Sequence, residues 1–153
     1  MTKHRRLHAV DGETQLGAAT QSLRASRDRK ETYVTNAVKH FKWEARGKRR
    51  IHKKPNTLEI AACRPWLDAE IEVVKPQVVV CLGATAAHAL LGRSFRVTQQ
   101  RGKLLPFSPE FHVLATVHPS SILRAVDDES RQQEFDRFVK DLRVVANTLL
   151  GQS

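Results

Sequence analysis

The feature that most constrains the fold is an apolar run in the middle of the chain. Residues 77–82 read Gln-Val-Val-Val-Cys-Leu and end at Gly83. A strand that is apolar at consecutive positions is typical of a parallel sheet with both faces covered by helices. Residues 111–117 predict another strand, which leads directly into His118. The two segments therefore predict an α/β fold.

The neighbouring segments alternate between helix and strand patterns. Residues 32–38 are β-branched and aromatic and predict a strand, and residues 95–98 predict a short one. Asn56 and Glu59 have the spacing of a capping box. They begin a helix with an apolar stripe through residue 74, which Pro65 should kink or restart. Further helices are predicted at residues 84–91 and 128–149. We expect a three-layer, open, mainly parallel sheet with helices on both faces, in one domain over residues 31–151.

Positive charge is concentrated in the first third of the chain. Residues 1–54 hold 15 Lys and Arg against 5 Asp and Glu, whereas residues 55–153 hold 11 of each. Residues 1–30 are polar and are expected to form a basic, poorly ordered arm with a short helix near residues 16–23. Residues 39–55 are expected to form a basic loop. Such a charge distribution attracts polyanions, and nucleic acid is the candidate partner.

The remaining composition excludes several classes. No apolar run has the ~20 residues of a membrane helix, and no apolar segment follows the first basic residues as in a secretory signal. We expect a cytoplasmic protein whose two cysteines, Cys63 and Cys81, do not form a disulfide.

Four segments, in one order, carry a family resemblance. They are residues 33–42 (Tyr-Val-Thr-Asn-Ala-Val-Lys-His-Phe-Lys), 47–52 (Gly-Lys-Arg-Arg-Ile-His), 62–67 (Ala-Cys-Arg-Pro-Trp-Leu) and 118–124 (His-Pro-Ser-Ser-Ile-Leu-Arg). They resemble the uracil-recognition strand, the distinguishing loop of the X-type branch, the cluster-proximal helix and the second active-site motif of the iron–sulfur uracil-DNA glycosylases. The similarity covers about residues 33–149.

The resemblance implies roles for residues that the fold places at strand ends. Asn36 would pair with uracil, because an amide offers both a donor and an acceptor. His118 would stabilise the leaving uracil with a hydrogen bond. On the sequence alone, each also fits an ordinary structural role at a strand end. Lys48, Arg49, Arg50, Ser120, Ser121 and Arg124 would contact DNA. Leu123 fits either an apolar wedge or a core position.

His52 is the candidate nucleophile. The X-type enzymes resemble ordinary glycosylases up to the oxocarbenium stage and then trap the sugar C1′ with the histidine of this loop. The resemblance therefore implies a covalent link between His52 and DNA, provided that the rest of the site is present. Read without the family, His52 is an ordinary histidine in a basic loop.

Two features depart from the family. Its 4Fe-4S cluster needs four ligands, two of them from a Cys-x-x-Cys that this sequence lacks. His40 and Cys63 align with the other two, so we do not expect a cluster unless another chain supplies ligands. The family's first active-site motif, Gly-Glu-x-Pro-Gly after an early strand, should lie well before Tyr33. Residues 12–17 echo it without the proline, and we interpret the echo as coincidence and the fold as N-terminally truncated.

These departures leave three hypotheses open. The first is an X-type uracil-DNA glycosylase-like enzyme acting on uracil-containing DNA. The second is a catalytically inactive DNA-binding remnant of the family. The third is a fragment that does not fold stably alone.

Overall fold

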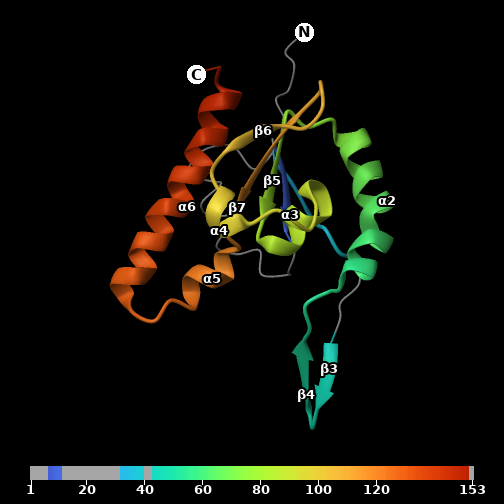
Figure 1. The fold of residues 1–153 in the computed structure, drawn as a ribbon, viewed down its shortest axis with the longest axis vertical. Coiled ribbons are helices and arrows are strands. Elements are labelled where there is room, and N and C mark those ends of the chain that lie inside the picture. Colours follow the sequence, from blue (N-terminus) through green and yellow to red (C-terminus); the bar gives the residue numbers. More distant parts are fainter. Residues whose placement is uncertain (1–6, 12–31, 40–42, 152–153) are drawn as a thin grey trace.

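The computed structural model describes residues 7–11, 32–39 and 43–151. It is built around a five-stranded sheet in the order β2-β1-β5-β7-β6 (Figure 1). The four strands from β2 to β7 are parallel, and β6 is antiparallel to β7. The strands are β1 (Leu7–Asp11), β2 (Thr32–Asn36), β5 (Val78–Leu82), β6 (Leu104–Pro106) and β7 (His112–Thr116).

Helices cover both faces of this sheet, which confirms the predicted three-layer α/β fold. They are α2 (Thr57–Val74), α3 (Ala84–Leu91), α4 (Val97–Gln100), α5 (Pro119–Leu123) and α6 (Asp128–Leu149). Val79 and Cys81 of β5 pack in one cluster with residues of α2, α3 and α4. Val78 and Val80 pack in a second cluster with α5 and α6. The alternation along β5 thus supplies two cores, as an apolar run buried on both faces should.

Helix α2 begins where the capping box predicts. The Asn56 side chain accepts from the backbone N–H of Glu59, and the Glu59 carboxylate accepts from the backbone N–H of Asn56. Of the kink or restart expected at Pro65, the restart is wrong, because α2 continues as one helix to Val74. Burial of Cys63 and Leu67 on either side of the proline holds the helix together against the lost hydrogen bond.

The expected basic arm over residues 1–30 is wrong at residues 7–11. These residues form β1, which lies between β2 and β5 and pairs with both. The strand is short, and the sequence on either side of it is polar and charged. Its stability therefore comes from pairing with two neighbouring strands, which no local sequence pattern indicates. The helix expected at residues 16–23 lies outside the described residues.

Two other segments differ from expectation. The segment 39–55, expected to be a loop, contains an antiparallel hairpin of β3 (Trp43–Arg46) and β4 (Arg49–His52). The strand expected at residues 95–98 is absent from the described structure there, where α4 begins at Val97. Among the helices that the structure describes, none is long and apolar enough to cross a membrane.

Candidate active site at the carboxyl edge of the sheet

The carboxyl ends of the four parallel strands are in register. Asp11 is paired with Asn36 on one side and with Leu82 on the other, and Leu82 is paired with Thr116. At a spacing of ~4.8 Å per strand, this row is roughly 14 Å long. His118 follows the row two residues after Thr116. The fold therefore brings Asn36 and His118 to one edge, which is where open α/β sheets bind ligands.

His118 has a fixed orientation at the start of α5. The backbone N–H of Ser120 donates to its Nδ1 at 3.1 Å, and the Ser120 hydroxyl lies 2.7 Å from the same nitrogen. Arg124 in turn donates to the Ser120 hydroxyl at 3.0 Å. A backbone N–H can only donate, so Nδ1 is the unprotonated nitrogen and the neutral ring carries its proton on Nε2. His118 is thereby prepared as a hydrogen-bond donor through Nε2.

Gly83 lets the turn after β5 approach His118. A Cβ added at Gly83 would lie 3.0 Å from the His118 Cβ, and the backbone of Gly83 has a φ of 90°. Both observations favour glycine, because other residues rarely adopt that φ and would crowd the histidine. The sequence indicated a turn at Gly83 but not its contact with His118.

Asn36 carries an unsatisfied polar atom. Its Oδ1 is buried and has no hydrogen-bond partner among the described residues. Leaving such an atom unpaired costs about 1–3 kcal/mol, so native structures rarely retain one without a reason. Nearby, Lys39 ties the strand to α2, with its Nζ 2.8 Å from Glu70 and 2.6 Å from the Thr35 hydroxyl. The contacts of Lys39 therefore hold the segment that carries Asn36 against α2. The Oδ1 of Asn36 remains an unused acceptor.

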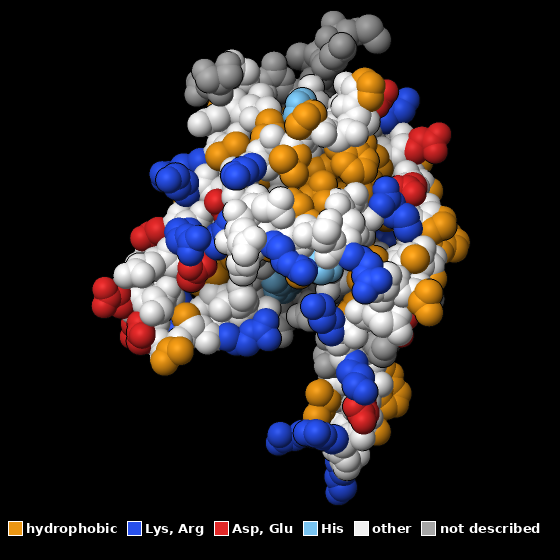
Figure 2. All heavy atoms as spheres, viewed as in Figure 1, with side chains coloured by type: hydrophobic (Ala, Val, Ile, Leu, Met, Phe, Trp, Pro, Cys, Tyr) orange, Lys and Arg blue, Asp and Glu red, His pale blue; other side chains and the backbone are white. Residues whose placement is uncertain are grey.

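The predicted cationic residues lie on the hairpin. Gly47 and Lys48 form its two-residue turn, with Gly47 at a φ of 60° as such turns favour. Lys48, Arg49 and Arg50 are all exposed. Figure 1 shows the hairpin extending away from the sheet below the lower end of α2, and Figure 2 shows Lys and Arg side chains along it. His52 is the last residue of β4, and its backbone pairs with Trp43.

The described residues do not fit a four-ligand cluster. Cys63 is 2% exposed, and its Sγ accepts a hydrogen bond from the backbone N–H of Lys39 at 3.3 Å. Cys81 lies inside the sheet, where burial raises the pKa of its thiol to about 12. No group of three or more potential ligands occurs in the part of the chain that the structure describes. His40, the other candidate ligand, lies outside that part.

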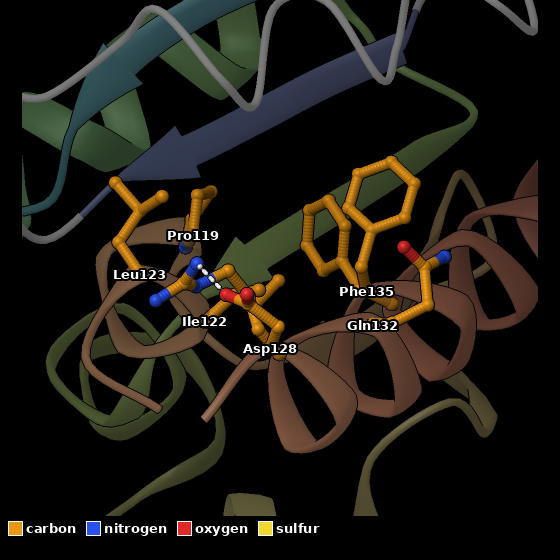
Figure 3. A pocket seen from close by; sticks show the side chains of 8 residues that line it. Pro119, Ile122, Leu123, Asp128, Gln132 and Phe135 are labelled. Atoms are coloured by element: carbon orange, nitrogen blue, oxygen red, sulfur yellow. Dashed lines mark hydrogen bonds and ion pairs between the residues drawn. The ribbon is translucent and has the colours of Figure 1, made fainter. Parts of the chain in front are cut away.

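A groove of about 470 Å³ lies between α5 and α6. In Figure 3, Pro119 and Leu123 lie at one end and Gln132 and Phe135 at the other. Its charged pair, Arg131 and Asp128, is joined at 2.7 Å. The groove is mainly apolar, and its one acid, Asp128, is paired with Arg131.

The family of the chain follows from its similarity to known proteins. The fold is that of an open, mainly parallel α/β sheet, a class in which ligands bind at the carboxyl ends of the strands, where Asn36 and His118 lie. The profile described as the Uracil DNA glycosylase superfamily matches residues 6–143. The chain therefore belongs to the uracil-DNA glycosylase superfamily.

Individual relatives match over a similar range. The type-4 uracil-DNA glycosylase of Thermotoga maritima is 35% identical over 74% of this chain, and that of Sulfurisphaera tokodaii is 29% identical over 63%. The match spans 56% and 44% of these two relatives, so the chain covers about half their length. A DNA polymerase of Bacillus phage SP01 is 27% identical over 80% of this chain and 12% of its own length.

The match from residue 6 also changes one interpretation. The family's first motif follows an early strand, and β1 is such a strand, with Gly12 immediately after it. The described fold therefore retains a parallel strand ahead of β2. Residues 12–17 themselves lie outside the described residues, and the absence of the motif's proline stands.

Proposed function

We propose that this protein binds uracil-containing DNA and excises uracil. The observation that carries the proposal is the shared edge of Asn36, with its unused buried acceptor, and His118, with its proton fixed on Nε2. A uracil edge offers an N–H to the Asn36 oxygen and a carbonyl to its NH₂ group. The buried Asn36 oxygen has no hydrogen-bond partner among the described residues, which supports a ligand role for it.

In the proposed reaction, the C1′–N1 bond breaks and its electron pair leaves with uracil. The His118 Nε2–H donates to the uracil oxygen on which negative charge grows, and so stabilises the leaving group. Water then adds to C1′ and releases a proton to solvent. Because Nδ1 already accepts from Ser120, the donor needs no reorientation during the reaction.

DNA contact is proposed for the β3–β4 hairpin and for the segment around Arg124 at the end of α5. Lys48, Arg49 and Arg50 offer exposed charges on the hairpin. Arg124 is also exposed, and it keeps further N–H groups for phosphate besides the one given to Ser120. Ser121 is exposed in the short helix that Arg124 caps, and it donates its hydroxyl to the His118 carbonyl at 2.7 Å. These contacts would hold the strand while the base is turned out of the stack.

The finer proposal is a covalent step at His52, which rests on the X-type resemblance of residues 47–52. Uracil would leave with the electron pair of the C1′–N1 bond and take a proton from solvent. An imidazole nitrogen of His52 would donate its lone pair to C1′ in place of water, and the ring would then lose its other proton to solvent. No step of this sequence requires an oxidant, a reductant or a metal.

The test is a uracil-containing single-stranded oligonucleotide incubated with the protein. We expect free uracil and a denaturation-resistant adduct. His52→Ala should abolish the adduct and retain uracil release, whereas His118→Ala should reduce both. His112→Ala, at the opposite end of β7, is the matched control and should change neither. The absence of both adduct and free uracil would overturn the proposal.

A catalytically inactive DNA-binding protein is the second candidate function. It is favoured by the absence of a fitting ligand set around Cys63 among the described residues and by the first motif's missing proline. This candidate predicts salt-sensitive binding that does not distinguish uracil from thymine. Tighter binding to the uracil-containing strand would exclude it.

A further inference from the structure

Trp43 is a large aromatic side chain that the fold does not bury. It is 45% exposed and belongs to neither core cluster. The guanidinium of Arg50 lies 4.6 Å from the centre of its ring. Every residue of the hairpin whose exposure is described, from residue 43 to residue 51, is exposed. An indole in this position contributes little to the core and remains available to a ligand.

The surroundings of Trp43 favour a polyanion. Arg46, Lys48, Arg49 and Arg50 share the hairpin with one acid, Glu44. That acid is engaged by Lys53 at 2.9 Å, just after β4. The local field is therefore positive, and Arg50 adds a cation over one face of the ring. Groups that bind single-stranded nucleic acid combine these features: cations that follow the backbone and an aromatic face on which a base stacks.

We propose that Trp43, with Arg50 stacked on it, is a platform for an unpaired base of single-stranded DNA bound along the hairpin. The inference deepens the proposed function by naming the form of the DNA that this surface takes. In a duplex the bases are already stacked on one another, so an exposed indole gains nothing from them. The guanidinium holds one face of the indole, and a base covers the surface that is left.

Tryptophan fluorescence tests this proposal directly, because the chain has two tryptophans, Trp43 and Trp66. In Trp66→Phe, Trp43 is the sole reporter, and titration with uracil-free oligothymidylate should quench its emission. A fully abasic oligomer of equal length should bind through the cations but quench far less. In the reciprocal variant, Trp43→Phe, the emission of Trp66 should not respond to either oligomer.

Affinity provides the second readout. Stacking of one base on an aromatic side chain predicts that Trp43→Ala weakens binding of oligothymidylate roughly 5- to 150-fold. The same change should leave binding of the abasic oligomer nearly unaltered. Trp43→Phe keeps a ring and should retain most of the affinity, which separates stacking from any loss of hairpin structure.

Three results would overturn the inference: equal quenching by the abasic oligomer, equal quenching by a duplex, or unchanged oligothymidylate affinity in Trp43→Ala. None of these measurements requires uracil or excision. Quenching without uracil release would therefore support the stacking role of Trp43 and contradict the glycosylase proposal. Uracil release without quenching would support the glycosylase proposal and contradict the stacking role of Trp43.

Discussion

Gly83 is the residue whose replacement should separate activity from stability. In Gly83→Ala, the new Cβ meets the His118 Cβ at 3.0 Å, and the backbone keeps a φ of 90° that alanine disfavours. The strain should lower the free energy of unfolding by about 1–2 kcal/mol. Displacement of His118 should in addition reduce uracil release about tenfold or more, since small misplacements of a catalytic group are costly.

Gly92→Ala is the matched control for this prediction. Gly92 has a φ of 92°, but a Cβ added there meets nothing within 4 Å. It should lose a similar amount of stability in a denaturant titration and keep its uracil release per folded molecule. Equal activity in the two variants would show that Gly83 does not position His118.

Glu134 should make stability depend on acid pH. Burial acts to raise the pKa of its carboxyl, but hydrogen bonds from Arg101 and Arg137 outweigh burial and hold the pKa below its ordinary value of 4.5. The folded protein therefore binds this proton less readily than the unfolded chain. The stabilisation is present above pH 4.5 and is lost as pH falls through the lowered pKa.

The check is urea denaturation between roughly pH 6 and pH 3. Glu134→Gln should flatten the decline of unfolding free energy below pH 4.5, relative to the unmodified protein. Glu129→Gln, at an exposed position in the first turn of α6, should leave the decline unchanged. Parallel curves for Glu134→Gln and the unmodified protein would contradict the prediction.

At the scale of elements, local sequence patterns predicted the secondary structure correctly where it depends on residues within one segment. The apolar run of β5 and the capping box of α2 are such cases, and the strand ends placed Asn36 and His118 on one edge. Strand β1 was missed because its partners, β2 and β5, are distant in sequence. The contact of Gly83 with His118 was missed for the same reason. The stacking of Arg50 on Trp43 was missed because residues 39–55 were expected to form a loop, whereas the contact depends on the hairpin.

The hairpin should dominate the salt dependence of DNA binding. Lys48→Ala with Arg49→Ala removes two exposed charges from it. For a single strand, each phosphate contact contributes about 0.7 to the slope of log K against log salt, so the slope should fall by about 1.4. Binding of a single-stranded oligonucleotide at several salt concentrations measures this. Lys140→Ala with Arg143→Ala, two exposed cations on α6, should change the slope much less.

For the whole molecule, the position of β1 decides whether the fold is cooperative. Strand β2 is joined to the sheet through β1, which pairs with β2 on one side and β5 on the other. The described core reaches from β5 and β7 to α2 and α6. A fold connected in this way should melt in one transition, with residues 7–11 included in it.

Val10→Pro tests this connection. A proline in a central strand removes a ladder hydrogen bond and has no edge to accommodate it. We expect the melting temperature to fall sharply or the single transition to be lost, because Val10 is paired with both Thr35 and Cys81. Val126→Pro, in the exposed stretch between α5 and α6, should leave the transition nearly unchanged. If residues 7–11 were instead an unpaired basic arm, the two variants would melt alike, and the link between β2 and the rest of the sheet would have to be sought elsewhere.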